Sequence, residues 1–397
     1  MTIRPILLIY IFIILSFFSC LNKEKSEIEA AKKAQTEKMQ PSVVKWEKLS
    51  PEYIAEKRKS IERFYNKTFP GTKNQISFLV AKNGQIIYEN YQGFGNPKKK
   101  ISIDSVTPIH IASVSKVITA TAVLKLVFSK KLKLNQKVNT ILPTFPYPEV
   151  TIQHLLSHRS GMRNYAYFTA DKGVWDDKHK LLKNQDILDL MANKNIKLES
   201  KTDTHFAYCN TNYAILALVI EAVTGKTYAQ AMKQMIFDPL GMKHTFVYDY
   251  DRDRQTTLPS YRINGSQISF DFLDLIYGDK NIYSTPRDLL KFDMARKSPA
   301  FLTTELCEKI YVGYSNEHKG TKNYGLGIRM VNWENGKNFY FHNGWWHGYM
   351  SSYITLLDEN VTIIALTNKA DKRVYKTKLL APLFGKYPFE GADDYNE

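Results

Sequence analysis

The chain has 397 residues and a formal net charge of +16, from 55 Lys and Arg residues against 39 Asp and Glu residues. This length allows a sizeable core, and three cysteines are too few for a disulfide framework. Neither zinc-ligand spacing nor an RNA-binding signature accompanies the charge, so nucleic acid is not an expected partner. The charge suits an anionic lipid surface or envelope polymer, and the alternative is a lysine-rich solvated surface without a partner.

An export signal opens the chain. A positive charge precedes the apolar run from Ile6 to Phe18, which ends at Ser19-Cys20. A run of this length suits a signal-peptide core but is short for a membrane span. A small residue before cysteine resembles a bacterial lipobox, so we expect a signal peptide over residues 1–19 and a lipid anchor on Cys20. Plain secretion is the alternative, because two phenylalanines directly precede Ser19.

The folded region is expected to begin with a helix and a β-hairpin. Residues 20–50 are rich in Lys, Glu and Ala and predict a tether to that region. A helical pattern follows over Glu52–Asn66. The apolar runs Ile76–Ala81 and Ile86–Tyr91 flank Asn83-Gly84, and an Asn-Gly turn between two such runs predicts a hairpin.

Helices and loops dominate the middle of the chain. The charged and aromatic stretch Arg163–Asn184 has no periodicity and is expected to be a surface loop that could lie over the site. Gly225 is suited to end a helix, and Ser284 or Thr285 to cap one. The predicted helices are 113–128, Thr151–Ser157, Asp186–Ala192, Asn212–Thr224 and Pro286–Arg296.

Strand patterns return near the end of the chain, at Tyr324–Trp333, Lys337–His342, Met350–Leu357 and Val361–Thr367, before a helix at Tyr375–Phe384. Strands at both ends with helices between them predict an α+β fold, in which an antiparallel sheet from both termini is flanked by helices. A mainly helical lobe is inserted into it. We expect one domain over residues 51–390, with the sheet lobe at about 51–112 and 300–390 and the helical lobe at about 113–299.

Ser113 and Lys116 begin an apolar, Ala-rich helix and share the face of its first turn. A serine hydroxyl needs a base to become a nucleophile, and a desolvated lysine can take its proton. Backbone N–H groups at a helix start could hold an oxyanion. The same pattern occurs at Ser42–Lys45, so context must decide. The alternatives are an N-cap role for Ser113 and a surface position for Lys116.

Three motifs supply that context: Ser113–Lys116, Tyr208–Asn210 and His342–Gly344. Together they resemble the motif set of the serine β-lactamase and penicillin-binding protein family. The tyrosine of the second motif resembles the class C β-lactamase, DD-peptidase and esterase branch. The match runs from about residue 55 to about 385. It implies a β-lactamase/transpeptidase-like fold and acyl transfer through a serine.

The resemblance assigns roles within the first two motifs. Ser113 is the implied nucleophile, and either Lys116 or Tyr208 takes its proton. Asn210 would donate to the acyl carbonyl of the substrate, or would cap the helix that follows. Cys209 stands where the family often has serine or alanine, and we expect a small buried residue without a catalytic role.

The third motif departs from many relatives, because His342 replaces a lysine. Its ring could orient the substrate or the Tyr208 hydroxyl, but it weakens recognition of a substrate carboxylate. Gly344 would let the substrate approach the strand. By the resemblance, the backbone N–H of Trp345 joins that of Ser113 in an oxyanion hole. Trp345 and nearby aromatic residues form an acyl-pocket wall or belong to the core.

The remaining histidines show no metal-ligand spacing, so neither a metal nor a cofactor is expected, and His158 is interpreted as a hydrogen-bonding turn residue. The predicted function is a serine hydrolase of the cell envelope. Its substrate is a small molecule or peptidoglycan-like group: an ester, a D-amino-acid peptide or, second, a β-lactam amide. The alternatives are an inactive penicillin-binding-like sensing module and a binder of envelope polymer. The sequence leaves the oligomeric state open.

Overall fold

The computed structural model describes residues 46–317 and 320–389. The predicted signal peptide, Cys20 and most of the predicted tether lie outside these residues. Within them, no helix combines the length and the apolar character needed to cross a membrane.

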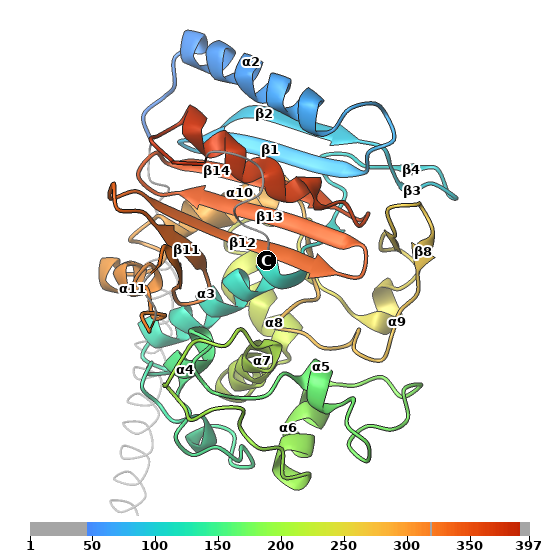
Figure 1. Ribbon diagram of the computed structural model, residues 1–397, viewed down its shortest axis with the longest axis vertical. Coiled ribbons are helices and arrows are strands. Elements are labelled where there is room, and N and C mark those ends of the chain that lie inside the picture. The colour runs from blue at the N-terminus through green and yellow to red at the C-terminus, as the bar shows by residue number, and fades with distance from the viewer. Residues whose placement is uncertain (1–45, 318–319, 390–397) are drawn as a thin grey trace, which may run out of the picture.

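A seven-stranded antiparallel sheet forms the frame of the fold (Figure 1). Its edge-to-edge order is β10-β11-β12-β13-β14-β1-β2, so strands from the end of the chain continue into strands from its beginning. Strand β1 pairs with β14, with Phe78 opposite Ala365. The strands are β1 (Ile76–Lys82), β2 (Gln85–Gln92), β10 (Lys322–Tyr324), β11 (Arg329–Asn332), β12 (Asn338–Trp346), β13 (Tyr349–Leu356) and β14 (Val361–Thr367). The prediction of an α+β fold with an antiparallel sheet from both termini is confirmed.

Helices cover both faces of this sheet. The outer face packs against α2 (Pro51–Thr68) and the 3₁₀ helix η4 (Lys372–Leu383). The inner face packs against α3 (Ser115–Phe128) and α10 (Pro286–Arg296). Nearly every residue of α3 is buried, as expected for a helix that is apolar all round. It is therefore the central helix of the larger core.

The chain between the sheet strands forms the rest of the molecule, with α4 to α7 gathered at the end away from α2 in Figure 1. Its helices are η1 (Ala112–Val114), η2 (Val138–Thr140), α4 (Ile152–Leu156), α5 (Tyr165–Phe168), α6 (Asn184–Asn193), α7 (Asn210–Thr224), α8 (Tyr228–Met232), η3 (Lys233–Phe237), α9 (Tyr250–Asp253) and α11 (Thr304–Ile310). Its short strands are β3 (Phe94–Asn96), β4 (Ile101–Ser102), β5 (Ile109–His110), β6 (Phe246–Val247), β7 (Ser260–Tyr261), β8 (Gln267–Ile268) and β9 (Ile282–Ser284).

Several sequence predictions differ from the structure in detail. The predicted strand Tyr324–Trp333 is two strands, β10 and β11, because the chain turns at Gly327, which has a φ of +84°. The predicted loop Arg163–Asn184 contains the short helix α5. The last helix is 3₁₀ and contains Pro382, which lacks the N–H that an α-helix would use. Thr285, one of the two candidates, caps α10.

Candidate active site

Ser113 and Lys116 are in direct contact at the start of the central helix. The Lys116 Nζ atom lies 3.0 Å from the Ser113 Oγ atom. The same Nζ atom donates to the backbone carbonyl of Asp279 at 2.9 Å. Lys116 is fully buried, whereas Ser113 is partly exposed. The hydroxyl is therefore accessible to a ligand, and the amine behind it is held by the protein.

The structural alternatives for Ser113 and Lys116 do not fit this geometry. Ser113 is the middle residue of η1, and the residues in the capping positions of η1 and α3 are Ile111 and Val114. Lys116 is a buried residue rather than a surface one. Neither of these two structural alternatives describes the observed positions.

The carboxylate of Asp279 is directed to groups other than Lys116. One carboxylate oxygen accepts from the Tyr165 hydroxyl at 2.7 Å, and the Lys280 ammonium lies 3.7 Å from the same oxygen. Lys280 itself donates to the Tyr165 hydroxyl at 2.7 Å. The charge of Asp279 is thus compensated by Lys280, and Lys116 is held by a carbonyl dipole.

The residue before Ser113 adopts a strained conformation. Ala112 has a φ of +47°, in the left-handed region that costs a residue with a Cβ about 1 kcal/mol or more. Its N–H donates to the His110 Nδ1 atom at 3.1 Å, and the other ring nitrogen of His110 contacts the Asn281 Oδ1 atom at 2.9 Å. Burial lowers the pKa of His110 to about 4, so the ring is neutral and can accept this bond. These contacts hold the bend that presents Ser113.

Tyr208 lies beside Lys116 and is surrounded by aromatic and cationic groups. The Lys116 Nζ atom is 5.1 Å from the centroid of its ring, and the Arg329 guanidinium carbon is 4.7 Å from it. The ring centroid of His158 is 4.5 Å away. The structure thus brings the second motif to the first, and it adds Arg329, which the sequence analysis did not identify.

His158 and Asn210 flank Tyr208. His158 adopts a φ of +57°, and its Nδ1 atom accepts from the Cys209 N–H and the Asn212 amide, in agreement with a hydrogen-bonding role at a turn. Asn210 is the first residue of α7, and the capping position belongs to Cys209. The buried Oδ1 atom of Asn210 has no hydrogen-bond partner among the described residues. Burial raises the pKa of the Cys209 thiol to about 11, consistent with an inert side chain.

His342 is buried beneath Tyr208 and contacts Tyr324. Its Nδ1 atom is 2.8 Å from the Asn343 carbonyl, and its Nε2 atom is 3.3 Å from the Tyr324 hydroxyl. Burial, with the charges of Arg329 and Lys116, holds its pKa well below the usual range. The neutral ring therefore donates from Nδ1 and accepts from the Tyr324 hydroxyl at Nε2. Its ring centroid is 6.2 Å from that of Tyr208, and the role expected for it, toward the substrate or the Tyr208 hydroxyl, stays a prediction.

Gly344 brings strand β12 against the bend that carries Ser113. A Cβ atom there would lie 2.4 Å from the Ile111 carbonyl oxygen and 2.2 Å from the Ser351 Oγ atom. The Ser351 hydroxyl donates to that carbonyl at 2.6 Å. Gly344 is required for this approach within the protein, and not only for the approach of a substrate. Trp345 follows it with 64% of its surface exposed, so its side chain is not a core residue.

We expect Gly344→Ala to lower activity strongly. Its Cβ would push β12 away from Ile111, and a misplacement of about 1 Å can reduce turnover about 10²-fold. Turnover of an activated ester measures the effect. Gly320→Ala is the matched control, because a Cβ there meets nothing within 4 Å. Equal activity of both variants would show that the close approach is unimportant.

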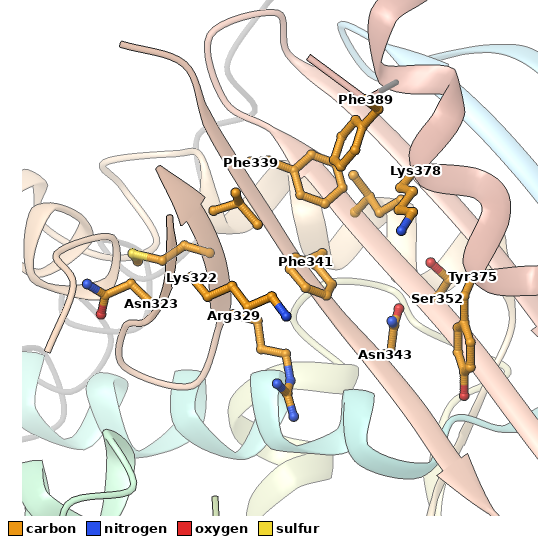
Figure 2. A pocket seen from close by; sticks show the side chains of 13 residues that line it. Lys322, Asn323, Arg329, Phe339, Phe341, Asn343, Ser352, Tyr375, Lys378 and Phe389 are labelled. Atoms are coloured by element: carbon orange, nitrogen blue, oxygen red, sulfur yellow. The ribbon is translucent and has the colours of Figure 1, made fainter. Parts of the chain in front are cut away.

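A pocket beside the site is lined by cationic, aromatic and amide side chains (Figure 2). It encloses about 110 Å³, and none of the thirteen described residues that line it is acidic. Arg329 and Asn343 lie at one end, and Phe339 and Phe389 at the other, as Figure 2 shows. The pocket lies on the outer face of the sheet, between β12 and η4, and Arg329, which also lies over the Tyr208 ring, is the residue that it shares with the site.

One cluster outside these motifs has the composition of a metal site. Ligand atoms of Asp271, Asp274 and His347 lie within 4.8 Å of one another. The Asp274 carboxylate already contacts His347 and accepts from the Trp346 indole N–H at 2.6 Å. We interpret it as a hydrogen-bonding group. Spacing in the sequence did not indicate this cluster, because its members come from two distant segments.

Comparisons with known proteins show the family to which the chain belongs. Residues 70–381 match the family described as Beta-lactamase. Penicillin-binding protein 4* of Bacillus subtilis is 31% identical over 82% of this chain and 74% of its own length. Teichoic acid D-alanine hydrolase of Staphylococcus aureus is 28% identical over 62% of this chain and 60% of its own length. The octameric penicillin-binding protein homologue of Pyrococcus abyssi shares the fold, with a TM-score of 0.70 and 23% identity. The match covers 83% of this chain and 78% of the Pyrococcus abyssi chain. The chain belongs to the β-lactamase family, as its motifs predicted.

Proposed function

We propose that this protein is a serine hydrolase that cleaves an ester or amide of a small, anionic, D-amino-acid-containing substrate through an acyl-enzyme on Ser113. The contact of the hydroxyl of the partly exposed Ser113 with the buried Lys116 amine, at 3.0 Å, is the observation that carries this proposal. A nucleophile within hydrogen-bond reach of a base that is itself oriented by a third group is the arrangement that acyl transfer needs. Here the third group is the Asp279 carbonyl.

In the proposed acylation step, the Ser113 oxygen attacks the substrate carbonyl carbon. Lys116, with one N–H held by Asp279, takes the hydroxyl proton. The backbone N–H groups of Ser113 and Trp345 stabilise the oxyanion, and the Asn210 amide contacts the acyl part of the substrate. In the tetrahedral intermediate the bond from the carbonyl carbon to the leaving oxygen or nitrogen then breaks, the leaving alcohol or amine takes the Tyr208 hydroxyl proton, and the acyl group stays on Ser113 as an ester.

In the proposed deacylation step, water attacks the Ser113 ester. Tyr208 lies beside Lys116. We assign to it the protonation of the leaving group in acylation and the activation of this water in deacylation. Tyr208 takes a proton from this water, the bond between the acyl carbon and the Ser113 oxygen breaks to release the acid, and the Lys116 ammonium returns its proton to Ser113. In this mechanism Lys116 is the base of acylation, and Tyr208 transfers protons to the leaving group and from the attacking water.

The pocket at Arg329 supports the substrate class. His342 is neutral, so it cannot supply the fixed charge that a lysine would supply at that position. Arg329 lies next to Tyr208, so we assign to its guanidinium the fixed positive charge that a lysine would otherwise supply. One relative is named a teichoic acid D-alanine hydrolase, and a structural neighbour is named a D-stereospecific amidohydrolase. These names agree with a D-amino-acid substrate.

Substrate panels test the proposal directly. Chromogenic esters and anilides of D-alanine and L-alanine, with and without a nearby carboxylate or phosphate, would be compared with a cephalosporin by steady-state turnover. We expect the D-enantiomers that carry an anionic group to have the highest kcat/KM. Cephalosporin turnover that exceeds ester turnover by orders of magnitude would instead identify a β-lactamase.

Arg329→Gln separates recognition from chemistry. Loss of a hydrogen bond to a charged group costs about 1.5–3 kcal/mol, so we expect KM for an anionic substrate to rise about 10-fold or more, with a small change for its neutral methyl ester. Lys372→Gln, at an exposed lysine of η4, controls for net charge. An equal rise in KM for both substrates would remove Arg329 from anion recognition.

A further inference from the structure

The turn that follows strand β12 is held to a segment distant in sequence by one buried carboxylate. Asp274 is 3% exposed. It accepts from the Trp346 indole N–H at 2.6 Å and contacts the His347 Nε2 atom at 2.9 Å. Both residues directly follow Trp345, whose backbone N–H is the second donor of the proposed oxyanion hole. Asp274 therefore restrains the end of β12 from outside the strand.

The segment that carries Asp274 also holds the nucleophile and its base. Five residues later, the Asp279 carbonyl accepts from Lys116. The Asn281 side chain donates to the Asp274 carbonyl at 2.6 Å and contacts His110, which accepts from the Ala112 N–H. Residues 274–281 thus make contacts with the base, with the bend before Ser113 and with the turn after Trp345.

Backbone strain occurs at both ends of this network. Asn281 has a φ of +70° and His347 a φ of +53°. Such conformations persist only when the surrounding contacts impose them. The hydrogen bonds of Asp274 supply contacts of this kind, because they join the strained turn at His347 to the strained bend at Asn281.

We propose that Asp274 is a positioning residue of this hydrolase, which holds the Trp345 N–H of β12 in register with Ser113 and Lys116 by fixing Trp346 and His347 to the segment that orients the base. This proposal rests on the proposed function, because it concerns the same Ser113 chemistry. The restraint acts on the acylation step. Its loss lowers the rate of attack by Ser113 more than it changes substrate affinity.

The contact between His347 and Asp274 depends on pH. Burial and the nearby charge of Lys280 disfavour the charged form of the His347 ring. The hydrogen bond with Asp274 and the negative charges of Asp274 and Asp271 favour it more strongly, so the pKa of His347 is raised. A raised pKa in the folded protein means that the contact stabilises fully below the ordinary value near 6.5 and loses this effect as pH rises through the raised pKa. The restraint is therefore strongest in acid and weakens toward alkaline pH.

The test uses the chain from Leu21 onward and its rate of labelling by a fluorophosphonate, which reports reactivity of the serine without a substrate. Asp274→Asn is expected to label about 10-fold more slowly and to lower kcat with less than a twofold change in KM, the result expected when only the transition-state geometry is lost. Trp346→Phe removes one donor and keeps a smaller aromatic ring, so a smaller decrease is expected. His347→Gln should match the parent at alkaline pH and fall below it near pH 6.

Controls separate this role from general stability. Asp358→Asn removes an exposed aspartate that pairs with Lys337 at 3.1 Å elsewhere on the sheet, and we expect parental labelling. Thermal unfolding identifies any variant that is not folded at the assay temperature. If the parent is labelled and folded Asp274→Asn and Trp346→Phe keep its rate and pH profile, the positioning role is wrong while the hydrolase assignment stands. If the parent is not labelled, the proposed function itself fails.

Discussion

Replacing the Ser113 hydroxyl abolishes both labelling and turnover if the proposed function is correct. We expect Ser113→Ala to lower kcat/KM by roughly 10⁴-fold or more, because loss of a nucleophile leaves only binding and oxyanion stabilisation. The substitution removes one oxygen at a partly exposed position, so the fold should be retained. Intact mass after fluorophosphonate treatment should show one adduct on the parent and none on the variant.

Ser102→Ala is the matched control, since Ser102 is an exposed serine of the same region and should leave the adduct unchanged. An adduct on Ser113→Ala would mean that another residue is the reactive nucleophile. The absence of an adduct on the parent would instead favour the inactive binding or sensing module as the function of this fold.

Lys116→Met should test the role of Lys116 as the base while the Ser113 hydroxyl is kept. We expect labelling and kcat to fall about 10²- to 10⁴-fold, the contribution of a positioned general base. Methionine has a similar length and suits a buried site, although the Asp279 carbonyl loses a donor at a cost of about 1–3 kcal/mol. The protein should therefore remain folded, which thermal unfolding would establish before rates are compared.

The central helix provides a close control for this substitution. Lys125 also lies in α3, is buried, and is placed to donate to a backbone carbonyl, that of Phe301, at 3.3 Å. Burial lowers its pKa to about 8. Lys125→Met should change stability on the same scale and leave labelling at the parental rate. Equal losses in both variants would show that the effect of Lys116→Met comes from disruption of the helix.

Local patterns in the sequence predicted much of the fold. The Asn83-Gly84 turn, the helix end at Gly225 and the proline start of α10 depend on backbone preferences of single residues, and each occurs where the sequence indicated. The strand Tyr324–Trp333 was predicted as one piece, because its apolar pattern hides the turn at Gly327. Close packing of that turn against Ala120 of α3 is a tertiary contact that no local pattern reveals.

The three motifs were recognised as one set from their order along the chain. Their chemistry depends on distances that only the fold creates: the buried Lys116 held by Asp279, the neutral His342 bound by Tyr324, and Arg329 over the Tyr208 ring. No sequence motif marks Asp279 or Arg329. Asp279 contacts Lys116 through its backbone carbonyl, which every residue has, and Arg329 is placed over Tyr208 only by the fold.

By itself, the sequence determined the family, the candidate reactive residues and most of the secondary structure around them. The tertiary structure alone decided which groups surround the Ser113 hydroxyl, because burial and charge at a site are sums over segments far apart in the chain. Asp274 shows the same limit: its partners, Trp346 and His347, are more than seventy residues away, and only folding brings the three together.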